Sequence, residues 1–132
     1  MIRQYHGGDY EDVAYLNKIS YERPCSGAEL KEKIRHGAWV AEINGQVIGA
    51  AIVCPENDKT LLWSITVAPA QQNKGWGATL LREVARNFPE LWLYVSIASD
   101  ARRLYEREGF RIEKLIMDHY GPGQHAYLMR KK

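Results

Sequence analysis

The dipeptide Asn44-Gly45 constrains the fold of this chain more than any other feature. It separates two apolar segments, residues 39–43 and 46–54, and Asn-Gly suits a two-residue hairpin turn because both turn positions need a positive φ. The second segment is almost wholly apolar from Val47 to Val53, as is typical of a strand covered on both faces. The sequence therefore predicts a hairpin buried inside a sheet, and it excludes an all-helical protein.

Helix and strand patterns alternate on both sides of this hairpin. The expected strands are residues 1–5, 39–43, 46–54, 60–67, 91–97, 110–117 and 125–129. Four helices are expected, beginning at the cap Asp9, at the Ser26/Glu29 capping box, at residues 75–77 and at Ser99. No linker divides the 132 residues, so we expect one α/β domain, residues 1–132, with a mixed sheet.

Composition narrows the class of protein. Eighteen Lys and Arg against 16 Asp and Glu give a net charge of +2, which disfavours binding to nucleic acid. The longest apolar stretch, residues 47–54, is far shorter than the roughly 20 residues of a membrane helix. The N-terminus has no signal-peptide pattern, and Cys25 and Cys54 show neither a disulfide framework nor metal-ligand spacing. We expect a cytoplasmic protein with reduced thiols, no metal and no membrane contact.

The segment that carries chemistry joins the strand at residues 60–67 to the next helix. Gly75 and Gly77 precede and open that helix, where unpaired N–H groups and the positive end of the helix dipole stabilise an anion, most naturally a phosphate. Lys74 adds a cation nearby, or is a solvated surface charge. A dinucleotide fingerprint and a P-loop both fit less well, since the third glycine and the Gly-Lys pair are absent. Two glycines can also make only a turn.

Two motifs in order resemble the GNAT superfamily of acetyltransferases. Residues 72–77, Gln-Asn-Lys-Gly-Trp-Gly, resemble its Gln/Arg-x-x-Gly-x-Gly/Ala pyrophosphate loop, and Val67-Ala68-Pro69 is similar to the strand end before it. Residues 101–110 are similar to the family's Ala-x-x-Leu-Tyr-x-x-x-Gly-Phe segment. The resemblance covers essentially the whole chain.

This resemblance implies a GNAT-type mixed, mostly antiparallel sheet, splayed between its fourth and fifth strands and flanked by four helices. Acetyl-CoA would lie in the splayed region as the acetyl donor. Backbone groups of residues 65–67 would pair with the pantetheine and with the acetyl carbonyl, the latter often at a bulge. The residues expected at the cofactor are Ile65, Thr66, Val67, Gln72, Asn73, Lys74, Gly75, Trp76, Gly77, Ala78, Thr79 and Ala98.

Tyr105 matches the family tyrosine that protonates the departing CoA thiolate. A phenol can donate to a thiolate even without full proton transfer. Without the motif, Tyr105 would be interpreted as a core residue spaced with Ala101 and Leu104. Two positions depart from the family: Ala98 replaces a common asparagine, and Tyr94 stands where the N-terminal-alanine branch carries a catalytic glutamate.

The missing glutamate leaves the general base open. A neutral amine must attack the thioester, so a group must take up a proton. The candidates are Glu42, Asp118, His119 and a water held near Ser64. Histidine side chains titrate in a suitable range, although Glu42 and His119 are also typical of solvent-facing positions.

The acceptor is an amine of one of two kinds. Residues 117–129 resemble the closing hairpin of protein N-terminal acetyltransferases, which favours a protein or peptide amine over a small molecule such as a polyamine, an amino acid or a drug. Together with residues 21–25, this hairpin would wall an acceptor groove, for which the candidate lining residues are Tyr21, Trp39, Trp63 and Tyr120. A catalytically weak acyl-CoA-binding module is the alternative class. Monomer and homodimer both remain open.

Overall fold

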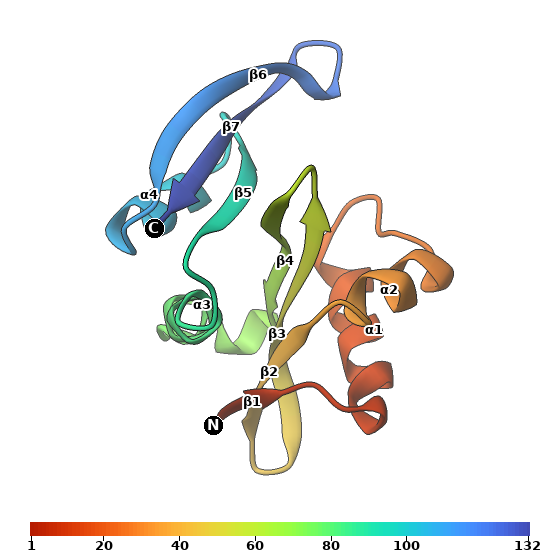
Figure 1. Ribbon diagram of the computed structural model, residues 1–132. Coiled ribbons are helices and arrows are strands. Elements are labelled where there is room, and N and C mark those ends of the chain that lie inside the picture. The colour runs from red at the N-terminus through yellow and green to blue at the C-terminus, as the bar shows by residue number, and fades with distance from the viewer.

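A seven-stranded sheet forms the centre of the computed structural model, which describes all 132 residues (Figure 1). Its strand order is β1-β2-β3-β4-β5-β7-β6, and every neighbouring pair is antiparallel except β4 and β5. The strands are β1 (Ile2–Gln4), β2 (Ala38–Ile43), β3 (Gln46–Glu56), β4 (Lys59–Val67), β5 (Leu91–Ser96), β6 (Arg111–Gly121) and β7 (Gln124–Lys131). The helices are α1 (Tyr10–Ser20), α2 (Gly27–Ile34), α3 (Trp76–Ala85) and α4 (Ala101–Arg107).

Two apolar cores cover the two faces of the sheet. On one face α1 and α2 pack against β2 and β3, with Val13, Leu16 and Leu30 buried against Val40 and Ile52. On the other face lie α3 and α4, whose buried side chains join alternate residues of the same strands. Figure 1 shows α1 and α2 on the opposite side of the sheet from α3. Successive side chains of a strand point to opposite faces of the sheet, so the same strands contribute residues to both cores.

The predicted central hairpin is confirmed. Asn44 and Gly45 both have positive φ, +52° and +79°, and Ile43 pairs with Gln46 across the turn. Residues 47–54 of β3 are all buried. β3 then forms a second hairpin with β4, in which the two strands pair antiparallel from Glu56↔Lys59 to Gly49↔Val67.

The strand and helix bounds differ from the prediction mainly at the ends. β6 continues to Gly121, four residues beyond the predicted end, because the closing turn narrows to Pro122-Gly123. Ser26 caps α2 as predicted, since its Oγ accepts the Glu29 N–H at 3.1 Å. Asp9 does not cap α1: a 3₁₀ turn, Gly7–Asp9, precedes that helix, and other donors occupy the Asp9 carboxylate.

β4 and β5 meet at a single residue pair, Leu61↔Trp92, and then diverge. β4 also carries one extra residue relative to β3: Ser64 pairs with Ile52 and Leu62 with Val53, so Trp63 is bulged. The predicted mixed sheet, splayed between its fourth and fifth strands and flanked by four helices, is thereby confirmed. No helix in the structure is long and apolar enough to cross a membrane.

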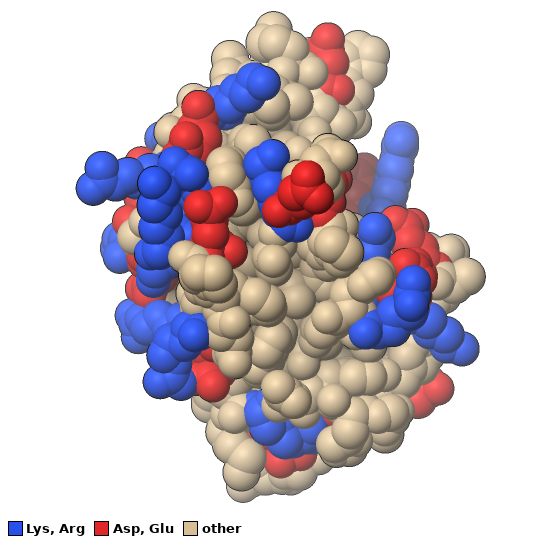
Figure 2. Space-filling model, viewed as in Figure 1, with Lys and Arg blue, Asp and Glu red and all other residues tan.

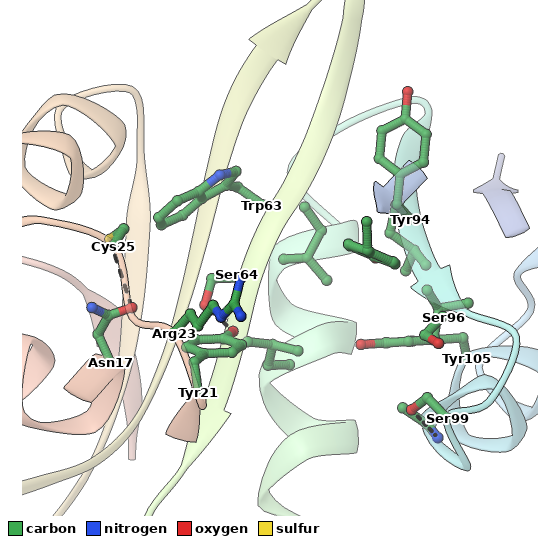
Figure 3. A pocket seen from close by; sticks show the side chains of 16 residues that line it. Asn17, Tyr21, Arg23, Cys25, Trp63, Ser64, Tyr94, Ser96, Ser99 and Tyr105 are labelled. Atoms are coloured by element: carbon green, nitrogen blue, oxygen red, sulfur yellow. Dashed lines mark hydrogen bonds between the residues drawn. The ribbon is translucent and has the colours of Figure 1, made fainter. Parts of the chain in front are cut away.

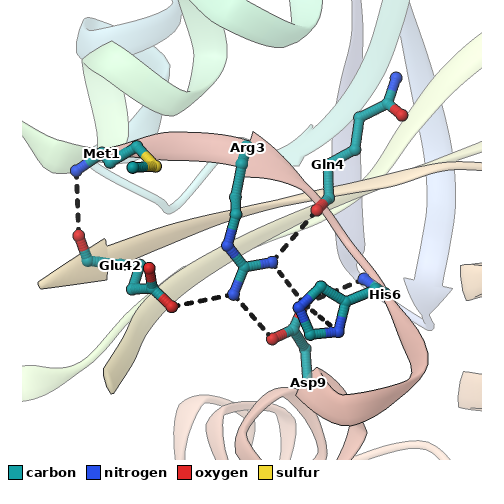
Figure 4. A network of polar contacts seen from close by, with 6 residues as sticks. All are labelled: Met1, Arg3, Gln4, His6, Asp9 and Glu42. Atoms are coloured by element: carbon teal, nitrogen blue, oxygen red, sulfur yellow. Dashed lines mark hydrogen bonds and ion pairs between the residues drawn. The ribbon is translucent and has the colours of Figure 1, made fainter. Parts of the chain in front are cut away.

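A polar network ties β1 to the rest of the fold (Figure 4). Arg3 donates two hydrogen bonds to the buried Asp9 carboxylate, at 2.8 and 2.9 Å, and a third to Glu42 Oε2 at 3.0 Å. The His6 N–H donates to Asp9 as well, at 2.9 Å. These contacts, above all the Arg3 hydrogen bonds, hold the pKa of the Asp9 carboxyl below its usual value.

Replacing Arg3 with methionine is expected to lower the free energy of unfolding by about 3 kcal/mol at neutral pH, because it leaves a buried carboxylate without its partner. The folded-state pKa of Asp9 lies below its usual value. The stabilisation from the Arg3–Asp9 contact is therefore fully present at pH values above the ordinary carboxyl pKa, and it is lost as pH falls through the folded-state pKa. In urea titrations, the difference in free energy of unfolding between wild type and Arg3→Met should therefore narrow as pH falls below the ordinary carboxyl range. Arg111→Met, at an exposed position, is the control.

Candidate active site

The divergence of β4 and β5 opens a cavity of about 420 Å³ (Figure 3). Residues 62–65 form one wall and residues 93–96 the other, with α4 below and the loop between α1 and α2 across the opening. Beyond Leu61, the edge of β4 that faces β5 has no strand to pair with. Backbone groups without a partner are costly unless water or a ligand satisfies them. We call this space the seam cavity.

A second cavity of about 570 Å³ continues from the seam cavity toward α3. Three residues, Ile65, Ala101 and Tyr105, line both cavities, so the two are contiguous. The rest of its wall comes from residues 71–73 and 75–78, from Val67, and from Asp100 and α4. We call this second space the loop cavity.

The loop cavity has the features of an anion site. No turn, loop or cap hydrogen bond is donated by the backbone N–H groups of residues 73–78, and the first turn of α3 has no acidic side chain. Gly75 has a φ of +88°, which favours glycine, and nothing lies within 4 Å of where its Cβ would be. Free amides at the N-terminus of a ten-residue helix attract phosphate. The arrangement fits the diphosphate of a nucleotide.

Most of the residues predicted to bind the cofactor lie around these cavities. The ones that line the loop cavity are Ile65, Val67, Gln72, Asn73, Gly75, Trp76, Gly77 and Ala78. The Gln72 side-chain amide donates to the Val67 carbonyl oxygen at 3.0 Å, so it currently closes the loop onto the end of β4.

Four predicted residues do not line either cavity: Thr66, Lys74, Thr79 and Ala98. Thr66 is buried beside Ala50 of β3, and the Thr79 hydroxyl donates to the Gly75 carbonyl within α3. Lys74 is exposed, and the exposed Ala98 donates its N–H to Ser96 Oγ at 3.2 Å. Ala98 was predicted to lie at the cofactor, but its neighbours Ser96 and Ser99 line the seam cavity instead.

The sequence interpretation missed the contribution of α4 to the loop cavity. Leu104 and Arg107 of α4, and Asp100 directly before the helix, line it together with the predicted Tyr105. Arg107 is exposed and forms no ion pair, so its charge is available to an anion. The signal was present in the spacing, because positions 100, 104 and 107 recur at three and four residues on one helix face.

Tyr105 lies where the two cavities join. Its side chain is 9% exposed, packs edge-on against Phe110, and directs its hydroxyl across the gap toward β4 (Figure 3). Burial raises the pKa of Tyr105 to about 12, with smaller contributions from Tyr21 and Tyr120. The hydroxyl therefore stays protonated at neutral pH. A buried, protonated phenol that faces a cavity can donate a hydrogen bond to a group bound there.

The opposite wall carries a hydroxyl pair. Tyr21, from the loop after α1, and Ser64, beside the β4 bulge, lie with their hydroxyl oxygens 2.6 Å apart. Burial raises the pKa of the Tyr21 hydroxyl above its usual value. The Cys25 thiol, whose pKa burial also raises, donates to Asn17 Oδ1 at 3.8 Å.

Two of the candidate bases are engaged elsewhere. Glu42 accepts from Arg3 in the network of Figure 4 and lines neither cavity, so it cannot serve as the base. Asp118 shapes the hairpin turn: its Oδ1 accepts the Gly123 N–H at 2.7 Å and its own N–H donates to His125. His119 stacks on Tyr94 with ring centres 4.2 Å apart, and Ser64 faces the seam cavity.

The expected acceptor groove contains three of its four predicted aromatic residues. Tyr21, Trp63 and Tyr120 line the seam cavity, between the α1–α2 loop and the end of β6. Trp39 does not: it is 7% exposed in the core beneath α3 and packs edge-on against Phe88. Alternation along β2 turns Trp39 toward α3, the side opposite α1 and α2.

Comparison with known proteins agrees with this arrangement. Residues 35–112 match the model of the acetyltransferase (GNAT) domain. The chain is 34% identical to the [ribosomal protein bS18]-alanine N-acetyltransferase of Haemophilus influenzae, across 91% of this chain and 87% of that protein.

Solved structures share the fold. The ribosomal-protein-S18-alanine N-acetyltransferase from Escherichia coli superposes with a TM-score of 0.87 at 23% identity, covering 99% of this chain and 92% of the other. An aminoglycoside 6'-N-acetyltransferase complexed with coenzyme A gives 0.86 at 14% identity, covering 99% and 96%.

The chain belongs to the GNAT acetyltransferase family. It is an N-acetyltransferase whose co-substrate is acetyl-CoA.

Gly77 gives the sharpest test of the loop cavity. A Cβ there meets Leu104 Cδ2 at 3.6 Å, an ordinary contact, so Gly77→Ala should fold and change acetyl-CoA affinity only slightly. Gly77→Glu should weaken binding about 100-fold or more, because it places a negative charge where the diphosphate is expected. Calorimetric titration with acetyl-CoA measures both. Wild-type affinity in Gly77→Glu would exclude this loop as the phosphate site.

Proposed function

We propose that the chain acetylates the α-amine of a protein or peptide N-terminus by direct attack on acetyl-CoA in a ternary complex. The observation that carries the proposal is the continuity of the cavities: amides of residues 73–78 at one end, the Tyr105 hydroxyl at the junction, and the aromatic groove at the other end. The printed activity of the Haemophilus influenzae relative supports an N-terminal acceptor.

Each part of these adjoining cavities has its own proposed role in binding or catalysis. The loop amides and Arg107 hold the phosphates, and the unpaired edge of β4 beyond Leu61 pairs with the pantetheine amides. The bulged segment of β4 around Trp63 lines the seam cavity, and its backbone N–H groups are the proposed donors to the acetyl carbonyl. Acetyl-CoA supplies the activated acetyl group.

The acceptor amine enters from the side of Tyr21 and Tyr120 and attacks the carbonyl carbon. As the C–S bond breaks, Tyr105 donates its proton to the sulfur. The Tyr105 hydroxyl is protonated at physiological pH, so it can hydrogen-bond to the sulfur as negative charge develops there. The proton lost by the amine leaves through water in the groove, near Ser64.

We also propose that the chain is a single domain that works in the cytoplasm as a monomer or homodimer, without binding nucleic acid. One continuous sheet supports the single domain. Both cysteines are free thiols, which suits a reducing compartment. Figure 2 shows basic side chains mixed with acidic ones rather than an unbroken basic face.

Tyr105→Phe tests the acid. Removing the hydroxyl should lower kcat about 10- to 100-fold, because the thiolate then leaves without its proton donor. Affinity for acetyl-CoA should stay within about threefold, since the ring and its Phe110 contact remain. Turnover is measured as CoA release, and affinity by calorimetry. A variant that turns over at the wild-type rate would remove Tyr105 from the chemistry.

An acceptor panel tests the substrate class. The panel holds a peptide with a free N-terminal alanine, the same peptide blocked at its N-terminus but carrying a lysine, a polyamine and an aminoglycoside. We expect kcat/KM to be at least about tenfold higher for the free N-terminus, a ratio worth about 1.4 kcal/mol of transition-state binding. Preference for the polyamine or the aminoglycoside would assign the chain to small-molecule acetylation instead.

A further inference from the structure

A third cavity of about 220 Å³ opens off the acceptor side of the seam cavity. The two share Leu62, Trp63, Tyr94 and Tyr120, so a molecule whose amine lies in the seam cavity can extend into this one. Its remaining walls are Glu56, Leu61 and His119. We call it the Glu56 cavity.

Glu56 is the only acidic residue around this space, and it has no cationic partner. The side chain is half-buried at the end of β3, and none of the ion pairs of the chain includes it. Lys59 pairs with Glu56 in the hairpin register, but its ammonium lies over the Trp92 ring, 5.0 Å from the centroid. A half-buried carboxylate without a counter-charge is a strong site for a cation.

The carboxylate is also fixed in place. The Tyr94 hydroxyl donates to Glu56 Oε2 at 2.9 Å, which leaves Oε1 without a donor. The Tyr94 ring stacks on His119, which in turn packs edge-on against Tyr120. In Figure 3 the Tyr94 hydroxyl points away from Tyr105, so this group serves a part of the substrate other than the reacting carbon.

The walls suit a long cationic side chain. Trp63, Tyr94 and Tyr120 present aromatic surface between the seam cavity and Glu56. Aromatic faces bind both the aliphatic stem and the charged head of lysine and arginine. A positive group would therefore find a carboxylate at the end of an aromatic passage.

We propose that the Glu56 cavity is a specificity subsite for a second positive charge on the acceptor, beyond the amine that is acetylated. The inference rests on the proposed function, because it concerns the same acceptor groove. In a peptide the charge belongs to a lysine or arginine side chain next to the N-terminal residue. In a small acceptor it belongs to a second ammonium, which shares the same chemistry.

The test compares two peptides that begin with alanine and differ only at position two, arginine in one and the uncharged citrulline in the other. We expect wild type to prefer the arginine peptide about tenfold, mainly through a lower KM. In Glu56→Gln the preference should fall to near unity. Tyr94→Phe, which frees the carboxylate to move, should give an intermediate ratio.

Asp58→Asn is the matched control. It removes one negative charge from the same β3–β4 turn, at an exposed position outside all three cavities. It should keep the wild-type preference. An equal loss of preference in Asp58→Asn and Glu56→Gln would mean that the general field of the protein attracts cations, and it would overturn the subsite.

Two further measurements distinguish a peptide from a small acceptor as the source of the charge, and the subsite from the proposed function. A diamine compared with a monoamine of equal length shows whether a small acceptor uses the subsite. Calorimetric affinity of the CoA-saturated enzyme for the two peptides is measured alongside turnover. Turnover without charge preference would overturn the subsite and leave the proposed function standing. Glu56-dependent affinity for the arginine peptide without turnover would support the subsite and contradict the proposed function.

Discussion

The structure depends on the place where two parallel strands stop pairing. β4 and β5 meet only at Leu61↔Trp92, because β4 is bound along its length to β3 whereas β5 is bound to β7. Each strand follows its own sheet segment, so their carboxyl ends diverge. Backbone groups are left unpaired on β4 in the middle of the molecule, where burial normally excludes them. A ligand that carries amide groups can satisfy the unpaired backbone groups of β4.

The remaining parts of the site follow from this divergence. The chain leaves β4, turns through Gly75 and begins α3 with its free amides aimed at the same opening. The return strand β5 leads into α4, which brings Tyr105 and Arg107 to the opposite side. At the far end, the β3–β4 hairpin and β6 carry Glu56, His119 and Tyr120. The proposed sites of phosphate binding, proton donation and acceptor selection thus follow one another along the three cavities.

Local sequence signals predicted the features that depend on a few neighbouring residues. Asn44-Gly45 predicted the hairpin, and residues of the glycine loop and of the Tyr105 motif lie on opposite walls of the loop cavity. Contacts between distant segments were missed. The sequence predicted Asp9 as a helix cap, but its carboxylate accepts hydrogen bonds from Arg3 of β1. It offered Glu42 as a candidate base, but the Glu42 carboxylate accepts from the same arginine. The Tyr94–Glu56 hydrogen bond joins residues 38 positions apart, and no spacing rule anticipates it. Trp39 shows the same limit. Alternation along β2 predicts that its side chains point to both faces of the sheet, but it does not predict which helices cover each face.

The central claim is that acetyl-CoA fills the passage between β4 and β5 with its diphosphate on the loop amides. Amide hydrogen exchange with and without acetyl-CoA tests it most directly, because amides without an acceptor exchange quickly and become protected when a ligand binds them. The account predicts new protection at residues 73–78 and at the end of β4, with unchanged exchange in the distant β1–β2 pair. Unchanged exchange at both segments in the presence of saturating acetyl-CoA would contradict it.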